Sequence, residues 1–478
     1  MEPYKNKITS SDSYINEKNN ISNKPSEIKN NPKDQLTKLC FKYLTTNDTK
    51  NSALELEAKY GTKGIKRISK QDLDNVIKKL TSLGFIAKTN KYSLKIQPEF
   101  IDTKTGRFKT TEIENFRVEI KGLNTIQEYC KNNILPEKAK IMRKTVVKIS
   151  DNSDQIYEPA NFDDFNFRVT LKNEEDISKT SKLGMDLLDN WTKAKKIFRY
   201  INRSSFTHPD YSEFYIDISM VKSSSKNERG YMIPTYNMDE SDVITNPETY
   251  EIEIELNGAE TLKKYGGFNP TDLDIGMQKA KELVASILNI NKTILSGLQR
   301  SNYPISYLEQ KNVLHSYMKL LFEDEFKKRG EEYVPKNEIY PSDFLGPSSK
   351  ALQIKNITPI IPDISVPNIT APNSFCVTDK ADGERHLLFI NNSGKIYLIS
   401  SNMKVSFTGA ITEETELFNS IVDGELILHD KNGKFINTFA AFDIYYINKV
   451  DVRARPFIQI LNSDEPMFKE GTRLKMLK

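Results

Sequence analysis

Two short segments of the chain carry glutamate at every second position. They are Glu55-Leu56-Glu57 and Glu251-Ile252-Glu253-Ile254-Glu255. Side chains of a β-strand alternate between its faces, so each set lies on one face with about 7 Å between neighbours. Such a face is solvated surface in an ordinary half-exposed strand. If it instead lines a barrel, the crowded carboxylates have raised pKa values unless a cation, such as a divalent metal with oxygen ligands, compensates them.

Strands with the opposite charge lie between these two segments. Their basic residues share faces at even spacing, namely Arg168 with Lys172 on 165–172 and Arg199 with Arg203 on 197–206. On the next strand, 214–221, the acid Asp217 shares a face with Ser219. Lys144 and Lys148 also share a face, but Arg143 falls on the other, so the inward face of 139–150 stays open. A barrel with acidic and basic walls would hold a metal and a polyphosphate, whose terminal phosphate water attacks in line.

This arrangement resembles the triphosphate tunnel metalloenzymes, specifically the RNA triphosphatase module of mRNA capping enzymes from large DNA viruses. The resemblance covers about 36–300 and implies removal of the γ-phosphate from 5′-triphosphate RNA with Mg²⁺ or Mn²⁺. Its metal motifs match Glu55, Glu57, Glu251, Glu253 and Glu255, its basic strand matches Arg199 and Arg203, and one of its acids matches Asp217. Together with Arg168 and Lys172, which share a face by their spacing, Arg199, Arg203 and Asp217 are the triphosphate-binding residues that we expect. The family often has a third basic residue where this chain has Ile201, which weakens the transfer of phosphate contacts but not of the fold.

A lysine motif stands further along the chain. It reads Lys380-Ala381-Asp382-Gly383-Glu384-Arg385, and by itself an Asp-Gly turn between strands would explain it. Two further motifs follow, Ile421-Val422-Asp423-Gly424-Glu425-Leu426 and Phe439-Ala440-Ala441-Phe442-Asp443-Ile444. In order and spacing the three motifs resemble the covalent nucleotidyltransferases, which comprise mRNA guanylyltransferases and the DNA and RNA ligases.

The second resemblance implies a nucleophilic lysine. Lys380 would attack the α-phosphate of GTP, and it can do so only as a neutral amine whose pKa is lowered by burial or nearby cations. The nucleotide would contact Asp382, Arg385, Glu425, Phe442 and Asp443, with Phe442 as a stacking surface for the purine. The family's later paired-lysine strand and OB-fold do not follow, so we expect a poor or inactive covalent step in this chain. We also expect the chain to be a fragment of a longer protein.

Three hypotheses remain open for the function. The first is a capping enzyme that acts on 5′-triphosphate RNA and GTP, a family in which some members have a stimulatory subunit or a C-terminal methyltransferase domain. The second is an ATP-dependent RNA or DNA ligase, which leaves the acidic and basic strands unexplained. The third is a non-catalytic RNA-binding or scaffolding protein with a degenerate transferase domain.

Composition narrows the class of protein. The chain has 478 residues, a length that implies two or three domains. Of these residues 37% are hydrophobic, and the net charge is +4. It lacks an apolar run long enough for a membrane span or signal peptide, so we expect a protein that is not secreted and is cytoplasmic, in a viral factory or virion. Three separated cysteines and four scattered histidines give little support to a disulfide framework or a zinc site.

The hydrophobic pattern predicts an α+β chain of several parts. We expect a disordered arm over 1–33, an antiparallel β-barrel domain with helices over 34–300, a connecting helical segment over 301–340, and the first part of a nucleotidyltransferase α+β domain over 341–478. Helices are predicted at 272–298 and 305–329. Ser69 to Asp72 is typical of a capping box at the start of another helix.

Overall fold

The computed structural model describes residues 31–46, 54–61, 67–88, 91–101, 108–109, 116–150, 154–357, 376–458 and 471–478. Most of the expected N-terminal arm therefore lies outside the described residues. So do residues 358–375 of the expected nucleotidyltransferase part.

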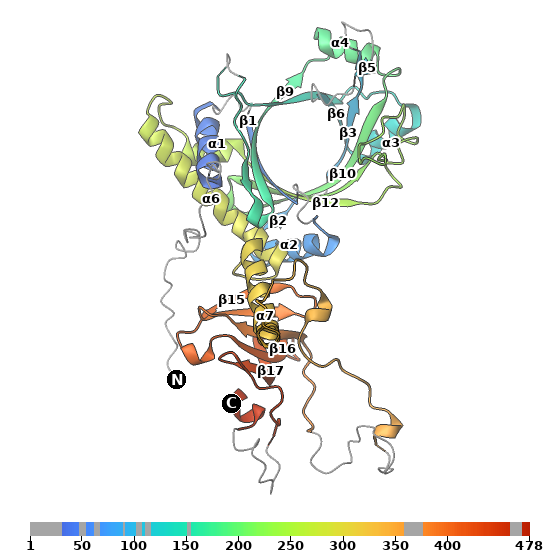
Figure 1. Ribbon diagram of the computed structural model, residues 1–478. Coiled ribbons are helices and arrows are strands. Elements are labelled where there is room, and N and C mark those ends of the chain that lie inside the picture. The colour runs from blue at the N-terminus through green and yellow to red at the C-terminus, as the bar shows by residue number, and fades with distance from the viewer. Residues whose placement is uncertain are drawn as a thin grey trace.

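Eight antiparallel strands form a closed barrel (Figure 1). In chain order they are β1 (Leu54–Tyr60), β3 (Lys91–Pro98), β6 (Phe116–Lys121), β7 (Lys140–Val146), β9 (Phe167–Ile177), β10 (Lys196–Thr207), β11 (Phe214–Ser223) and β12 (Thr249–Leu256). The order around the barrel is β1-β12-β11-β10-β3-β6-β7-β9, and β9 pairs again with β1 to close the ring. The barrel expected from the sequence is thus confirmed.

Two short strands extend this sheet, β2 (Ile86–Ala87) and β8 (Ala160–Phe162). A separate two-stranded sheet consists of β4 (Phe100–Ile101) and β5 (Phe108–Lys109), and η3 (Asp163–Phe165) and η4 (Pro209–Tyr211) are single turns. β2 pairs with the end of β10, and β8 pairs with the start of β9.

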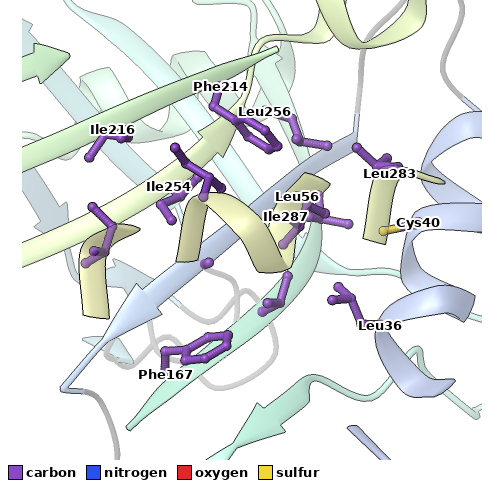
Figure 2. Close-up of a cluster of buried hydrophobic side chains, with 14 of the residues drawn as sticks. Leu36, Cys40, Leu56, Phe167, Phe214, Ile216, Ile254, Leu256, Leu283 and Ile287 are labelled. Carbon is purple, nitrogen blue, oxygen red and sulfur yellow. The ribbon is translucent and has the colours of Figure 1, made fainter. Parts of the chain in front are cut away.

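The hydrophobic core of this unit lies outside the barrel wall. One side is covered by α1 (Pro32–Thr46), α2 (Lys70–Ser82), α5 (Gly258–Tyr265) and α6 (Leu273–Gln299), and another by α3 (Leu123–Asn132) and α4 (Lys182–Asp189). Figure 2 shows Leu56, Phe167 and Ile254 of the wall gathered with Leu36 of α1 and Ile287 of α6. Because the apolar side chains point outward to the helices, the alternate side chains of each strand are left for the lumen.

The helix signals read from the sequence hold. Ser69 Oγ accepts a hydrogen bond from the Asp72 backbone N–H at 3.1 Å, and the Asp72 carboxylate accepts one from the Ser69 N–H at 3.1 Å. This is the predicted capping box at the start of α2. The helices predicted at 272–298 and 305–329 are α6 and α7 (Tyr307–Lys328).

A second unit contains a six-stranded antiparallel sheet in the order β15-β14-β13-β16-β17-β18. Its elements are β13 (Glu384–Ile390), β14 (Lys395–Ser400), β15 (Val405–Ile411), β16 (Ser420–His429), β17 (Phe435–Ile447), β18 (Val450–Asp451), α9 (Arg473–Leu477), and the turns η5 (Pro341–Asp343), η6 (Ile354–Asn356) and η7 (Thr415–Leu417). α7 packs on this sheet, where the Tyr317 and Phe389 rings meet edge to face.

Candidate functional site

The predicted acidic residues face one lumen. β1 and β12 are antiparallel neighbours, with Glu57 opposite Glu255 and Lys59 opposite Glu253. Their alternate residues, such as Leu56 and Ile254, are buried in the outer core. The structure therefore brings together all five predicted carboxylates, which are Glu55, Glu57, Glu251, Glu253 and Glu255, on the inner face of these two strands.

Lys59 links two of these carboxylates. Its Nζ lies 3.3 Å from Glu57 and 2.9 Å from Glu253. Burial alone would raise the pKa of Glu253, but Lys59 and Arg203 outweigh it and lower that pKa to about 2. Glu253 is therefore fully ionised at neutral pH and already paired with two cations.

Glu255 has the opposite environment. Burial, together with the nearby carboxylates of Glu55 and Asp217, raises the pKa of Glu255 to about 7. Within the described residues Glu255 forms no ion pair, whereas Glu55 is bound by Lys144, which also contacts Glu174 at 2.8 Å. This part of the acidic wall consequently has less positive charge than its carboxylates require.

The predicted basic residues also reach the lumen. Arg203 donates to Asp217 at 2.6 Å and to Glu253 at 2.7 Å, and Lys172 contacts Glu57 at 3.3 Å. Arg199 is paired with Glu251. Arg168 alternates with the outward Phe167 and Val169, and its buried Nε has no hydrogen-bond partner. The structure thus places Arg168, Lys172, Arg199, Arg203 and Asp217 around the same interior as the glutamates.

Several lumen residues were not singled out from the sequence. They are Lys59, Lys95, Arg117, Glu119 and Glu174, and Lys144 resolves the open choice on 139–150 by facing inward. Burial lowers the pKa of Lys95 to about 8, and the neighbouring positive charge of Arg203 contributes. Within the described residues Lys95 has no ion-pair partner. We call the inner face of β3 around Lys95 the basic wall. It lies across the ring from β1, and its positive charge is only partly neutralised by nearby carboxylates.

The same residues offer oxygen ligands to a divalent metal. Carboxylate oxygens are the ligands that Mg²⁺ and Mn²⁺ prefer, and the raised pKa of Glu255 marks a place where a cation would be stabilised. Among the described residues, no group of three or more acidic, histidine or cysteine side chains stands close enough to hold a metal ion. The oxygen ligands are thus of the right chemistry for a divalent metal but, in the described part of the chain, are not gathered around one point, and Lys59 is paired with two of them, Glu57 and Glu253.

The predicted nucleophile of the second unit is exposed. Lys380 lies in the loop before β13, and its side chain is 84% exposed and 2.9 Å from Asp382. The hydrogen bond that Lys380 donates to Asp382 raises the pKa of Lys380. The expected lowering of this pKa by burial or nearby cations is thus wrong for the described conformation, because solvent and an anion surround the amine instead.

Arg385 is held by protein groups. Its guanidinium donates to both oxygens of Asp423, at 3.0 and 2.5 Å, and to the carbonyl of Pro347 at 2.6 Å. The Tyr445 hydroxyl also donates to Asp423, at 2.5 Å. Asp423, which the sequence did not single out, is fully buried and fixes the direction of Arg385.

The remaining predicted nucleotide contacts lie on neighbouring strands. Glu425 of β16 is opposite Arg385 of β13, and β17 next to it carries Phe442 and Asp443. Phe442 is 40% exposed, so its ring is accessible. Asp443 accepts two hydrogen bonds from Arg473, at 2.9 and 3.2 Å, and is therefore already paired with a cation.

The comparisons with known proteins agree with the two parts of this description. Residues 368–471 match the family described as "mRNA capping enzyme, catalytic domain". A probable mRNA-capping enzyme of Acanthamoeba polyphaga mimivirus is 28% identical over 292 residues, which are 60% of this chain. Over this part of its length the chain is similar to the viral mRNA-capping enzymes. The expected likeness to a capping enzyme is thereby confirmed.

Two solved structures of triphosphatases are also similar. The mimivirus capping enzyme triphosphatase is 18% identical and covers 55% of this chain and 97% of its own, with a TM-score of 0.33. The S. pombe Pct1 RNA triphosphatase is 12% identical and covers 56% of this chain and 94% of its own, with a TM-score of 0.32. The chain spans 19% of the length of the mimivirus relative. None of the described helices is both long enough and apolar enough to cross a bilayer.

Proposed function

We propose that the barrel of this capping-enzyme relative removes the γ-phosphate from 5′-triphosphate RNA with a divalent metal, Mg²⁺ or Mn²⁺. Water would attack the γ-phosphorus, the bond to the β-phosphate would break, and RNA 5′-diphosphate and inorganic phosphate would leave. The viral relative supports a setting in a cytoplasmic viral factory or in a virion.

The observation that carries the proposal is the unbalanced charge on two walls of one lumen. The pKa of Glu255 is raised to about 7 by burial and by its acidic neighbours, so this wall would be stabilised by a cation. The pKa of Lys95 is lowered to about 8 by burial and by the charge of Arg203, so the other wall would be stabilised by an anion. A metal with a polyphosphate supplies both charges at once, which neither a lone cation nor a neutral ligand does.

The residues divide into two roles. Glu55, Glu57, Glu251, Glu253 and Glu255 would hold the metal, which when bound supplies charge neutralisation for the terminal phosphate and orientation for the water. A second set would bind the phosphate oxygens through charge-assisted hydrogen bonds, namely Arg168, Lys172, Arg199 and Arg203, together with Lys59, Lys95, Lys144 and Arg117. Asp217 accepts from Arg203 and so orients its guanidinium.

We also propose that the second unit is the first part of a guanylyltransferase. The Lys380 amine would attack the α-phosphorus of GTP, pyrophosphate would leave, and the GMP would then pass to the RNA 5′-diphosphate. The step needs Lys380 to lose its proton, yet Asp382 raises its pKa and the side chain is exposed. The conformation described is therefore unreactive, and we expect little covalent labelling while Lys380 stays exposed and paired with Asp382.

The decisive experiment measures phosphate release from 5′-triphosphate RNA with Mg²⁺ or Mn²⁺. We expect the Glu255→Gln variant to lose at least about tenfold in kcat/KM, which is about 1.4 kcal/mol of transition-state stabilisation. This position suits the test because Glu255 forms no ion pair within the described residues, so its amide variant should fold. Glu260→Gln, on α5 outside the barrel wall, is the matched control. Equal activity of wild type and Glu255→Gln would contradict the proposal.

A labelling experiment separates the capping enzyme from the ligase hypothesis. Radioactive GTP and ATP are offered to a chain extended past Lys478, and a protein-bound label is measured with Lys380→Ala as the blank. We expect label from GTP alone. Label from ATP alone would favour a ligase. The non-catalytic hypothesis is tested separately by thermal shift, and it would be favoured if neither the metal nor tripolyphosphate raised the Tm of the barrel.

A further inference from the structure

One mouth of the barrel has lysines around its edge. Lys91 begins β3, Lys121 ends β6 and lies near it because Lys121 is opposite Ser93, and Lys88 follows β2, where its backbone N–H donates to Ser205 at 2.8 Å. We call Lys88, Lys91 and Lys121 the lysine rim. All three are exposed.

The lysine rim opens into a cavity that reaches the acidic wall. This cavity measures about 810 Å³, and its lining runs from the rim to Arg203, Asp217 and Glu255. Lys95 also lines it, four residues along β3 from Lys91, which is about 13 Å along the strand. The rim and the proposed triphosphate site are therefore two ends of one continuous space.

The positive charge of the rim is available to a ligand. Within the described part of the chain, Lys88 and Lys91 form no ion pair, while Lys121 contacts Glu119 at 3.1 Å and remains 67% exposed. The Lys88 ammonium lies 5.0 Å from the centre of the Tyr215 ring, a cation–π contact that keeps it at the edge of the cavity. Tyr215 is itself two residues from Asp217 on the inner face of β11.

We propose that the lysine rim binds the phosphodiester backbone of the RNA just after its 5′-triphosphate. The inference rests on the proposed function, since it takes the triphosphate to lie between Lys95 and Glu255. A chain attached to that triphosphate must leave the lumen through a mouth, and its next anionic groups are phosphodiesters. Lysine ammonium groups at the edge of the cavity match this polyanion and make no demand on base sequence. The rim would thus favour RNA over inorganic tripolyphosphate.

The test compares the triple variant Lys88→Ala, Lys91→Ala, Lys121→Ala with a control triple variant of equal charge. The control replaces Lys38, Lys193 and Lys281, which are exposed and lie outside the lumen. The measured quantity is the ratio of kcat/KM on a short triphosphate-ended RNA to that on tripolyphosphate. We expect this ratio to fall at least about tenfold in the rim variant, through KM, and to stay unchanged in the control.

Binding of the same RNA, followed by fluorescence anisotropy at several salt concentrations, gives a readout without catalysis. Three lost phosphate contacts should reduce the slope of log affinity against log salt by about 2, at about 0.7 per contact on a single strand. Equal losses on RNA and tripolyphosphate, equal losses in both triple variants, or an unchanged slope would each overturn the proposal. If the wild-type protein binds RNA with a steeper salt dependence than the rim variant but releases no phosphate, the triphosphatase proposal is contradicted and the proposal for the lysine rim is supported.

Discussion

Charged side chains in the lumen neutralise one another only in part. Lys59, Arg203 and Lys144 are each shared between two carboxylates, and Glu253 is ionised with a pKa of about 2. Lys95 and Glu255, by contrast, have pKa values shifted toward neutrality. Because a shifted pKa is also a cost in folding free energy, these two residues connect stability with ligand binding.

Replacing Lys95 should stabilise the free protein and weaken polyphosphate binding. The folded-state pKa is below the ordinary 10.5, so the unfolded chain binds the proton more tightly and the charged lysine destabilises the fold at pH 7, a cost that declines as the pH rises from about 8 to about 10.5. We expect Lys95→Gln to raise Tm at pH 7 by a few degrees, at about 2–4 °C per kcal/mol, and to reduce the further rise with tripolyphosphate. Lys38→Gln on α1 should change neither, and a lowered Tm for Lys95→Gln would contradict the argument.

Because of Glu255, the stability of the metal-free protein should fall as the pH rises. Its folded-state pKa is raised from the ordinary 4.5 to about 7, so the native state binds the proton more tightly and stability falls as the pH rises through this range. A bound cation removes that cost, so stabilisation by Mn²⁺ should be larger at pH 8 than at pH 6 and should release protons. Calorimetry in buffers of different ionisation enthalpy measures the release, and Glu255→Gln should abolish the part due to this group. A stabilisation independent of pH would count against a metal at this wall.

At the scale of elements, the cap of α2 supports the outer core. The Ser69 hydroxyl accepts the Asp72 N–H at the start of the helix, whose Leu73, Val76 and Leu80 are buried in that core. We expect Ser69→Ala to lower the free energy of unfolding of the barrel unit by about 1 kcal/mol, measured by urea denaturation. Ser82→Ala at the other end of α2, where the hydroxyl donates to the Lys79 carbonyl, should cost clearly less. An equal loss of unfolding free energy in the two variants would show that the Ser69 cap does not stabilise the helix more than an ordinary hydroxyl on it.

The alternation of residues along strands explains what the sequence could predict. Glutamates at every second position between apolar residues placed five carboxylates on one face, and the barrel brought those faces together. Lys95 and Arg117 also lie on alternating segments, 91–95 and 116–121, but a strand face with a few charged residues of this kind is typical of solvated surface. Their inward position depends on the pairing of β3 and β6 with distant strands. The same holds for Asp423, whose role follows only from its contact with Arg385.

At the scale of the molecule, the two units have separate cores. The buried residues that pack around the barrel come from positions 36–295, and those of the second sheet come from positions 305–446. Contacts between the units include Arg300 with Glu384 at 3.1 Å, and a pocket that Phe165 and Leu298 line together with Tyr307 of α7. The large buried clusters nevertheless lie within one unit each.

α7 belongs energetically to the second unit, and this assignment is testable by cutting the chain on either side of it. Val313, Tyr317 and Met318 of α7 are buried against the sheet, and burial of side chains of this size contributes about 1.5–3 kcal/mol each. We expect a protein that begins at residue 301 to be soluble and to unfold cooperatively. One that begins at residue 330 loses α7, exposes Leu387 and Phe389, and should aggregate. The matched barrel protein, 31–300, should keep its tripolyphosphate hydrolysis in full, because every lumen residue lies within it. Aggregation of the 301 variant, or a soluble 330 variant, would show instead that α7 is stabilised by the barrel.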